Sequence, residues 1–165
     1  MEKYPMKTDG IVYRNPDSFF GYCGWPSVCQ DENGTLYAAY SGFRGSHICP
    51  FGKTCLTRSH DGGKTWSMPE QMDVQGSPPH LMVHSSGAVI MTFGRRIAPF
   101  GERAVVSYDN GRTWEREYVL RDDGVDGDLG YPATVELSDG SLITVYYQRV
   151  PGDRQDSILY TRWEL

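Results

Sequence analysis

The sequence lacks long apolar runs, and no stretch approaches the roughly 18 consecutive apolar residues that a membrane-spanning helix needs. The first residues, Met1 to Pro5, contain no apolar core like that of a secretory signal peptide. We therefore expect no membrane contact and a cytoplasmic location. An excess of positive charge is also missing, because the net charge is −5 at pH 7. This argues against nonspecific binding to nucleic acid.

Cysteine is scarce, with four residues at Cys23, Cys29, Cys49 and Cys55. None of them forms a CxxC pair, so we expect no zinc site, and no other metal or cofactor is expected. Without an export signal, free buried thiols are the favoured state. The alternative is a bond between Cys49 and Cys55, which flank a short loop.

Glycine and proline are abundant, with 19 and 10 residues in a chain of 165. Hydrophobic residues make up 39% and charged residues 22%. This composition is typical of a globular, turn-rich protein, and it predicts an all-β fold. The length corresponds to about one domain, which we assign to residues 1–165.

Three segments of the chain repeat with a period of 53 residues. Each has a proline, a glycine eight residues later and an aromatic residue six residues after the glycine. The repeated positions are Pro26, Gly34 and Tyr40; Pro79, Gly87 and Phe93; and Pro132, Gly140 and Tyr146. Such repetition is the signature of an architecture built from one recurring supersecondary unit.

Each unit predicts a strand, a glycine turn, a second strand, a longer loop, a third strand, a tight turn and a fourth strand. That is the four-stranded antiparallel blade of a β-propeller. We place blade one at about residues 21–72, blade two at 73–124 and blade three at 125–165. The third unit ends at the strand Ser157–Trp163 without a fourth strand. We expect the segment Gly10–Arg14 to supply that strand.

Two octapeptides share the pattern Ser-x-Asp-x-Gly-x-Thr-Trp, at residues 59–66 and 107–114. Glycine supplies positive φ in a tight turn, and the aspartate side chain bonds to backbone amides of that turn. Asp61 and Asp109 are therefore interpreted as structural residues rather than catalytic ones. The pattern resembles the Asp-box, or bacterial neuraminidase repeat, of the sialidase-like β-propellers. In that family the boxes lie on the face opposite the active site.

Three blades are too few for a closed ring, since propellers use about four to eight. The resemblance implies a ring of six blades. We therefore expect a homodimer, in which two chains of three blades make one ring and each Gly10–Arg14 strand completes a blade of the partner. The rival expectation is an open fragment with exposed sheet edges and apolar blade faces.

In a propeller, the entry to each inner strand and the loop between the second and third strands open on one face. The three predicted loops are residues 42–53, 94–103 and 147–157. They hold seven basic and three acidic residues, whereas the rest of the chain holds 9 basic and 18 acidic residues. A basic face on an acidic body favours a small anionic ligand, and arginine suits carboxylates in particular. The alternative is that these arginines are solvated or paired with neighbouring acids.

The resemblance implies a site with three arginines that hold a sugar carboxylate, a tyrosine nucleophile assisted by a glutamate, and an aspartate as acid and base. The match is partial, because Gly24 stands where the family has its first arginine, and residues 42–53 contain no acid. Tyr131 lies at the place of the nucleophilic tyrosine. Packing beside Pro132 is the alternative role for Tyr131.

The remaining predicted site residues follow from position and chemistry. His47 and Asp128 are candidates for moving protons. Trp25 is the counterpart of Tyr131 in blade one and suits stacking on a sugar ring. The arginines expected to bind substrate are Arg44, Arg95, Arg96 and Arg149.

Two functions follow from these residues. One is a sialidase-like glycoside hydrolase that acts on an acidic sugar. The other is a non-catalytic propeller that binds carbohydrate or serves in assembly, its active site having degenerated. The fold alone does not decide between them.

Overall fold

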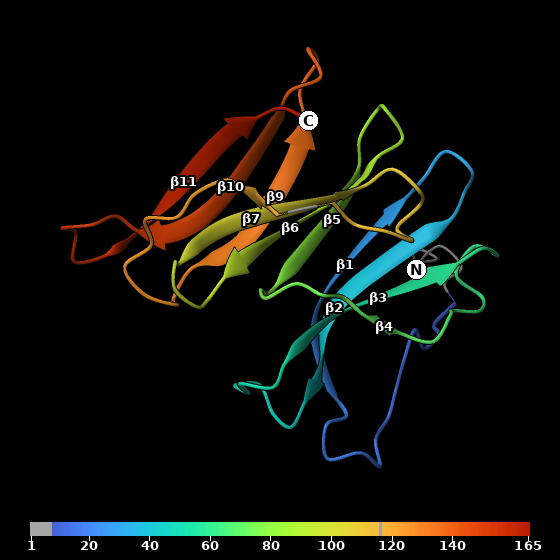
Figure 1. Cartoon of the computed structure of the whole chain (residues 1–165). Helices are drawn as coiled ribbons and strands as arrows, with labels where there is room; N and C mark the ends of the chain where they lie inside the picture. The colour runs from blue at the N-terminus through green and yellow to red at the C-terminus, as the bar shows by residue number, and fades with distance from the viewer. Residues whose placement is uncertain (1–7, 116) are drawn as a thin grey trace, which may run out of the picture.

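The structure, a computed structural model, describes residues 8–115 and 117–165. These residues contain eleven β-strands in three antiparallel sheets and no helix (Figure 1). No helix among them is long and apolar enough to cross a membrane. The prediction of an all-β chain built from antiparallel blades is confirmed.

Two of the sheets have four strands. The first has the order β1-β2-β3-β4, with bounds Tyr22–Gln30, Leu36–Arg44, Lys53–Ser59 and Glu70–Gln71. The second has the order β5-β6-β7-β8, with bounds Pro79–Val83, Val89–Arg95, Gly101–Ser107 and Tyr118–Val119. We refer to these sheets as blade one and blade two.

The third sheet, blade three, has only three strands in the described chain. They are β9 (Gly130–Glu136), β10 (Leu142–Arg149) and β11 (Asp156–Trp163), in the order β11-β10-β9. Strand β10 pairs with both neighbours, so β11 lies at the edge. The strands of each sheet lie within the residue ranges predicted for the three blades.

The blades are arranged as a fan in which each sheet packs face to face on the next (Figure 1). One apolar cluster, which includes Tyr37, Leu56, Met91 and Phe93, joins blades one and two. A second cluster, built around Ile90, Val106 and Leu142, joins blades two and three. The first strands β1, β5 and β9 lie side by side in order, so the three sheets form an open arc around their inner strands.

The repeated glycines lie at the turn between the first and second strands of each blade. Gly34, Gly87 and Gly140 have φ values of 82°, 85° and 83°. Only glycine adopts this region without steric cost, which explains why the residue recurs at the 53-residue period. The turn therefore has the same backbone conformation in all three blades.

The Asp-boxes form the turns between the third and fourth strands. In the second box the Asp109 carboxylate accepts hydrogen bonds from the Thr113 amide (2.8 Å) and hydroxyl (2.6 Å) and from the Ser107 hydroxyl (2.8 Å). Asp61 makes the same set of contacts in the first box. These bonds lower the pKa of both carboxyl groups. Both aspartate carboxylates thus stabilise the turn in which they lie.

The segment Gly10–Arg14 forms no strand within the chain and does not pair with β11. It lies against blade one, where the Tyr13 ring stacks on Tyr40 with centroids 6.2 Å apart. Val12 and Tyr13 border a small apolar pocket there together with Ala38 and Tyr40. No segment among the described residues therefore adds a fourth strand to blade three, and closure in a partner stays a prediction.

Candidate functional site

A cleft of about 540 Å³ lies where the inner strands of the three blades begin. Its walls come from the entry to each inner strand and from the loops after β2 and β6. Strand register places it at the opposite end of the sheets from the Asp-boxes, because Gly42 pairs with Lys53 at one end and Leu36 with Ser59 at the other. A volume of this size accommodates a small ligand such as a monosaccharide.

Trp25 and Tyr131 line the cleft from blade one and blade three. They occupy equivalent positions two periods apart, and Pro78 lines the cleft at the position between them. Both aromatic residues have left-handed backbones, with φ of 54° and 51°. That conformation is costly for a residue with a side chain, and such strain concentrates at functional sites.

Each aromatic ring has a guanidinium group over it. The Arg44 guanidinium carbon lies 4.5 Å from the centre of the Trp25 ring, and that of Arg96 lies 5.5 Å from the centre of the Tyr131 ring. These are cation–π distances. The two stacks give the cleft one aromatic–arginine pair on each side.

The two arginines differ in burial. Arg44 is buried and donates hydrogen bonds to the Ser41 hydroxyl (2.9 Å) and to the backbone oxygens of Ser46 and His47. Burial lowers the pKa of Arg44, and the charge of Arg96 lowers it further. Arg44 therefore holds the loop that carries His47, whereas the exposed Arg96 is open to a ligand.

His47 also lines the cleft. Its Nδ1 lies 3.0 Å from the Tyr22 hydroxyl, and its ring centre lies 4.8 Å from that of Trp25. The imidazole is thus held by one nitrogen and is exposed to solvent. It is placed to donate or accept a proton in the cleft.

Asp128 does not line the cleft. Its carboxylate accepts a hydrogen bond of 2.6 Å from the Tyr147 hydroxyl, and burial together with this bond raises the pKa of Tyr147 to about 12. The Tyr147 ring in turn lies 5.9 Å from that of Tyr131. Asp128 reaches the cleft only through this chain of contacts.

Two of the predicted substrate-binding arginines lie outside the cleft and pair with acids. Arg149 lies 3.1 Å from Asp126 and 3.5 Å from Asp156, and Arg95 lies 3.7 Å from Glu117. The alternative that loop arginines pair with neighbouring acids therefore holds for these two. Of the predicted set, the structure brings Trp25, Arg44, His47, Arg96 and Tyr131 together in the cleft.

The cleft is basic. Arg44, Arg96 and Lys53 line it, and among the residues that the structure describes its lining contains no aspartate or glutamate. A concave surface that carries cations and no carboxylate attracts anions, because its walls focus the field into the cleft. The same composition leaves the cleft without the two carboxyl groups of an ordinary glycosidase. The described residues contain no cluster suited to hold a metal ion.

Lys53 and Cys49 are chemically reactive or charged lining residues that are not among the predicted site residues. Lys53 was counted only in the charge balance, although its position at the end of the loop was a usable signal. Cys49 was treated only as a free thiol or half of a disulfide. All four cysteines are free, and hydrogen bonds from the Gly45 and Phe51 amides lower the pKa of the Cys49 thiol.

Comparison with known proteins agrees with this architecture. The BNR/Asp-box repeat family matches residues 57–68. No curated protein matches the chain. A solved structure of a protein of unknown function from Dyadobacter fermentans is 32% identical, with a TM-score of 0.72 over 85% of this chain and 37% of that one.

More distant solved structures are glycosidases. A Hadza microbial sialidase is 18% identical, with a TM-score of 0.59 over 89% of this chain and 34% of its own length. An α-L-arabinanase from Penicillium chrysogenum is 18% identical, with a TM-score of 0.64 over 85% of this chain and 45% of its own. At this identity the likeness shows the fold alone.

The chain thus folds as three β-propeller blades and carries the BNR/Asp-box repeat. Its fold is that of the propeller sialidases and arabinanases. It spans less than half the length of the structures named here.

Proposed function

We propose that the cleft binds an acidic sugar. The observation that carries this proposal is the lining. Two aromatic rings each have an arginine over them, Lys53 adds a third cation, and none of the described residues in the lining is an aspartate or glutamate. Aromatic rings stack on the apolar faces of sugars, and a guanidinium group binds both oxygens of a carboxylate. A carbohydrate ligand agrees with the α-L-arabinanase that shares the fold, whose structure was solved in complex with arabinobiose.

In this proposal each cleft residue has a separate role. Arg96 is exposed and takes the sugar carboxylate, with Lys53 adding to the positive field. Trp25 and Tyr131 flank the ring of the sugar. Arg44 stacks on Trp25 and holds the loop of His47 through hydrogen bonds to the Ser46 and His47 backbone oxygens.

Binding is tested by calorimetric titration with sialic acid, D-glucuronate and D-galacturonate, each compared with a neutral sugar. We expect at least one acid to bind and Trp25→Ala to weaken its binding at least tenfold, about 1.4 kcal/mol. Phe43→Ala is the matched control, because Phe43 is an exposed aromatic residue with positive φ that does not line the cleft. Equal loss in both variants, or no binding of any acid, would reject the proposal.

Hydrolysis is the second candidate function, and one observation favours it. Tyr131 is half exposed in the cleft and has Arg96 over its ring, as suits a phenolic nucleophile or a stabiliser of positive charge on the sugar. His47 is the proton-transferring group in the lining. Turnover of a fluorogenic sialoside or uronide that Tyr131→Phe abolishes would establish catalysis, whereas saturable binding without turnover would establish a binding module.

We also propose that two copies of the chain close one ring of six blades. This proposal is supported by the open arc of three blades and by the edge of β11, which pairs with no other strand of the described residues besides β10. In the closed ring the Gly10–Arg14 segment of each copy pairs with β11 of its partner. Light scattering on the eluting protein measures the mass, and a value of 18.6 kDa, that of one chain, at all concentrations would contradict closure.

A further inference from the structure

The outer face of blade three, which no other blade covers, is apolar and exposed. Val135, Val145, Ile158 and Tyr160 are 56%, 40%, 77% and 67% exposed. Register makes them neighbours, because Val145 pairs with Tyr160 and Ile143 pairs with Val135. A contiguous exposed apolar patch of this kind marks an interaction surface.

The repeat indicates that this face contacts another blade, because the equivalent positions do so in blade two. One period earlier, Ile90 and Thr92 stand at the positions of Ile143 and Val145. Ile90 packs against Leu142 of blade three, and the Thr92 hydroxyl lies 3.0 Å from that of Thr134. Blade two thus uses these positions to contact the next blade.

Blade one uses the same positions in the same way. Tyr37 and Ala39 stand two periods before Ile143 and Val145, and both are fully buried in the cluster shared with blade two. The uncovered face of blade three therefore consists of the same repeat positions that form the two blade–blade interfaces already present in the chain. We call it the donor face and define it by Val135, Ile143, Val145, Ile158 and Tyr160.

The repeat also identifies the face that receives a donor face. In blade two, Leu81, Met91 and Phe93 receive blade one. Their counterparts one period earlier are Val28, Ala38 and Tyr40, which we call the acceptor face. Val28 is 62% exposed, and it points away from blade two because the neighbouring Ser27 hydroxyl accepts a hydrogen bond from the Leu81 amide.

The rest of the acceptor face is covered by the chain's own N-terminal segment. Tyr13 stacks on Tyr40, and the Tyr40 hydroxyl is buried without a hydrogen-bond partner. The equivalent Tyr146 of blade three does have a partner, since its hydroxyl lies 2.8 Å from that of Thr161. The N-terminal segment that covers blade one therefore leaves the Tyr40 hydroxyl without a hydrogen bond, which destabilises this arrangement.

We infer that the donor face of blade three packs on the acceptor face of blade one in a second copy of this chain. The inference rests on the proposed ring of two copies and names the surfaces that close it. The contact is heterologous, since two different faces meet, and two copies close it because each provides one donor and one acceptor. Docking requires Tyr13 to leave Tyr40, which also releases the Gly10–Arg14 segment to pair with β11.

The inference is tested by a lysine on each face. We expect Val145→Lys and Val28→Lys each to raise the dissociation constant of the dimer at least about tenfold, since a charge is buried without a partner. Met68→Lys is the matched control, because Met68 is 77% exposed and lies on neither face. Circular dichroism and thermal unfolding show that each variant is folded.

Mixing Val145→Lys with Val28→Glu tests the heterologous geometry. In the mixed dimer one contact keeps both original side chains and the other pairs the new lysine with the new glutamate, so an equimolar mixture should dimerise more tightly than either variant does alone. A dimer that resists both lysine substitutions, or a mixture that stays monomeric, would overturn the assigned surfaces and with them closure of the ring through these faces. A monomeric wild-type chain would overturn both. Sugar binding in Val145→Lys reports separately on the cleft.

Discussion

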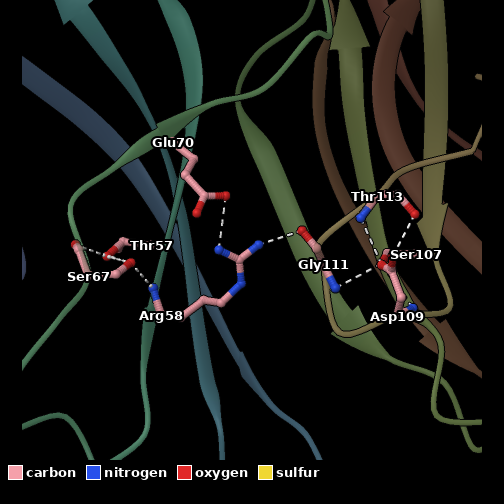
Figure 2. Close-up of polar contacts among 8 residues, drawn as sticks. All are labelled: Thr57, Arg58, Ser67, Glu70, Ser107, Asp109, Gly111 and Thr113. Atoms are coloured by element: carbon pink, nitrogen blue, oxygen red, sulfur yellow. Dashed lines mark hydrogen bonds and ion pairs between the residues drawn. The ribbon is translucent and has the colours of Figure 1, made fainter.

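Arg58 donates a hydrogen bond to the backbone oxygen of Gly111, which lies one period of 53 residues further along the chain (Figure 2). The same guanidinium group lies 3.0 Å from Glu70 of its own blade. Gly111 belongs to the second Asp-box, where its amide donates to the Ser107 hydroxyl at 2.8 Å. Blade one is therefore bonded to the turn of blade two at the end of the sheets opposite the cleft.

Removal of this link should destabilise the arc. The Arg58 side chain is only 12% exposed, and its loss leaves the Gly111 oxygen without that donor. We expect Arg58→Ala to lower the free energy of unfolding by about 1.5–3 kcal/mol, as is typical of a hydrogen bond to a charged group. Urea unfolding measures the change, and Arg112→Ala, at an exposed position of the same box, is the control. Equal effects of the two substitutions would contradict this role.

The Asp-boxes predict a loss of stability in acid. Hydrogen bonds from Thr113 and Ser107 hold the pKa of Asp109 at about 2, below its ordinary 3.8. A depressed pKa in the folded state stabilises the fold above the unfolded value, and this contribution disappears as pH falls through the folded value. The midpoint temperature of thermal unfolding should therefore fall more steeply between pH 5 and pH about 2 in the wild type than in Asp109→Asn. If the unfolding temperatures of the two proteins depend on pH in the same way, the Asp109 carboxylate does not hold the turn.

Glu102 should make the stability of the fold depend on pH in the opposite direction, at higher pH. It is fully buried on β7, neither carboxyl oxygen has a hydrogen-bond partner, and burial raises its pKa to about 8. The charges of Arg96 and Arg103 act against this rise. A raised pKa means that the folded state keeps its proton longer than the unfolded state, so stability falls as pH rises from about 4.5 to about 8.

Glu102→Gln, which mimics the protonated form, should remove this dependence. We expect the variant to be more stable than the wild type at pH 8, by at least about 1 kcal/mol, and nearly equal to it at pH 5. Glu32→Gln, at an exposed turn position, is the control. A stability difference that is the same at both pH values would show that Glu102 does not titrate in this range.

Most of the fold was predictable because it depends on local rules that repeat. The glycines at the 53-residue period require positive φ, and the two Asp-boxes require a bonded turn, so strands and blades follow from residue type and spacing. The packing of Tyr13 on Tyr40 was not predictable in this way. It depends on a contact between segments whose patterns are independent of each other.

The site was predictable in position but not in detail. Trp25 and Tyr131 could be placed at the cleft from the repeat alone, since both enter inner strands. Arg95 and Arg149 are the last residues of β6 and β10, at the same end of the sheets, but they pair with Glu117, Asp126 and Asp156. Which of these arginines pair with an acid depends on where the irregular segments place their carboxylates. The 53-residue repeat does not predict the conformation of those segments.

The most direct test of the account measures D-glucuronate and its methyl ester against wild-type protein and Arg96→Gln by titration calorimetry. The ester removes the ligand charge and the substitution removes the protein charge, so the double-mutant cycle isolates their interaction. We predict that the acid binds the wild type at least about tenfold more tightly than the ester does, and that Arg96→Gln abolishes this preference. Arg154→Gln, at an exposed loop position outside the cleft, should keep it. A preference that survives in Arg96→Gln would contradict Arg96 as the residue that binds the carboxylate, and a wild type that shows no preference would contradict an acidic-sugar site at this cleft.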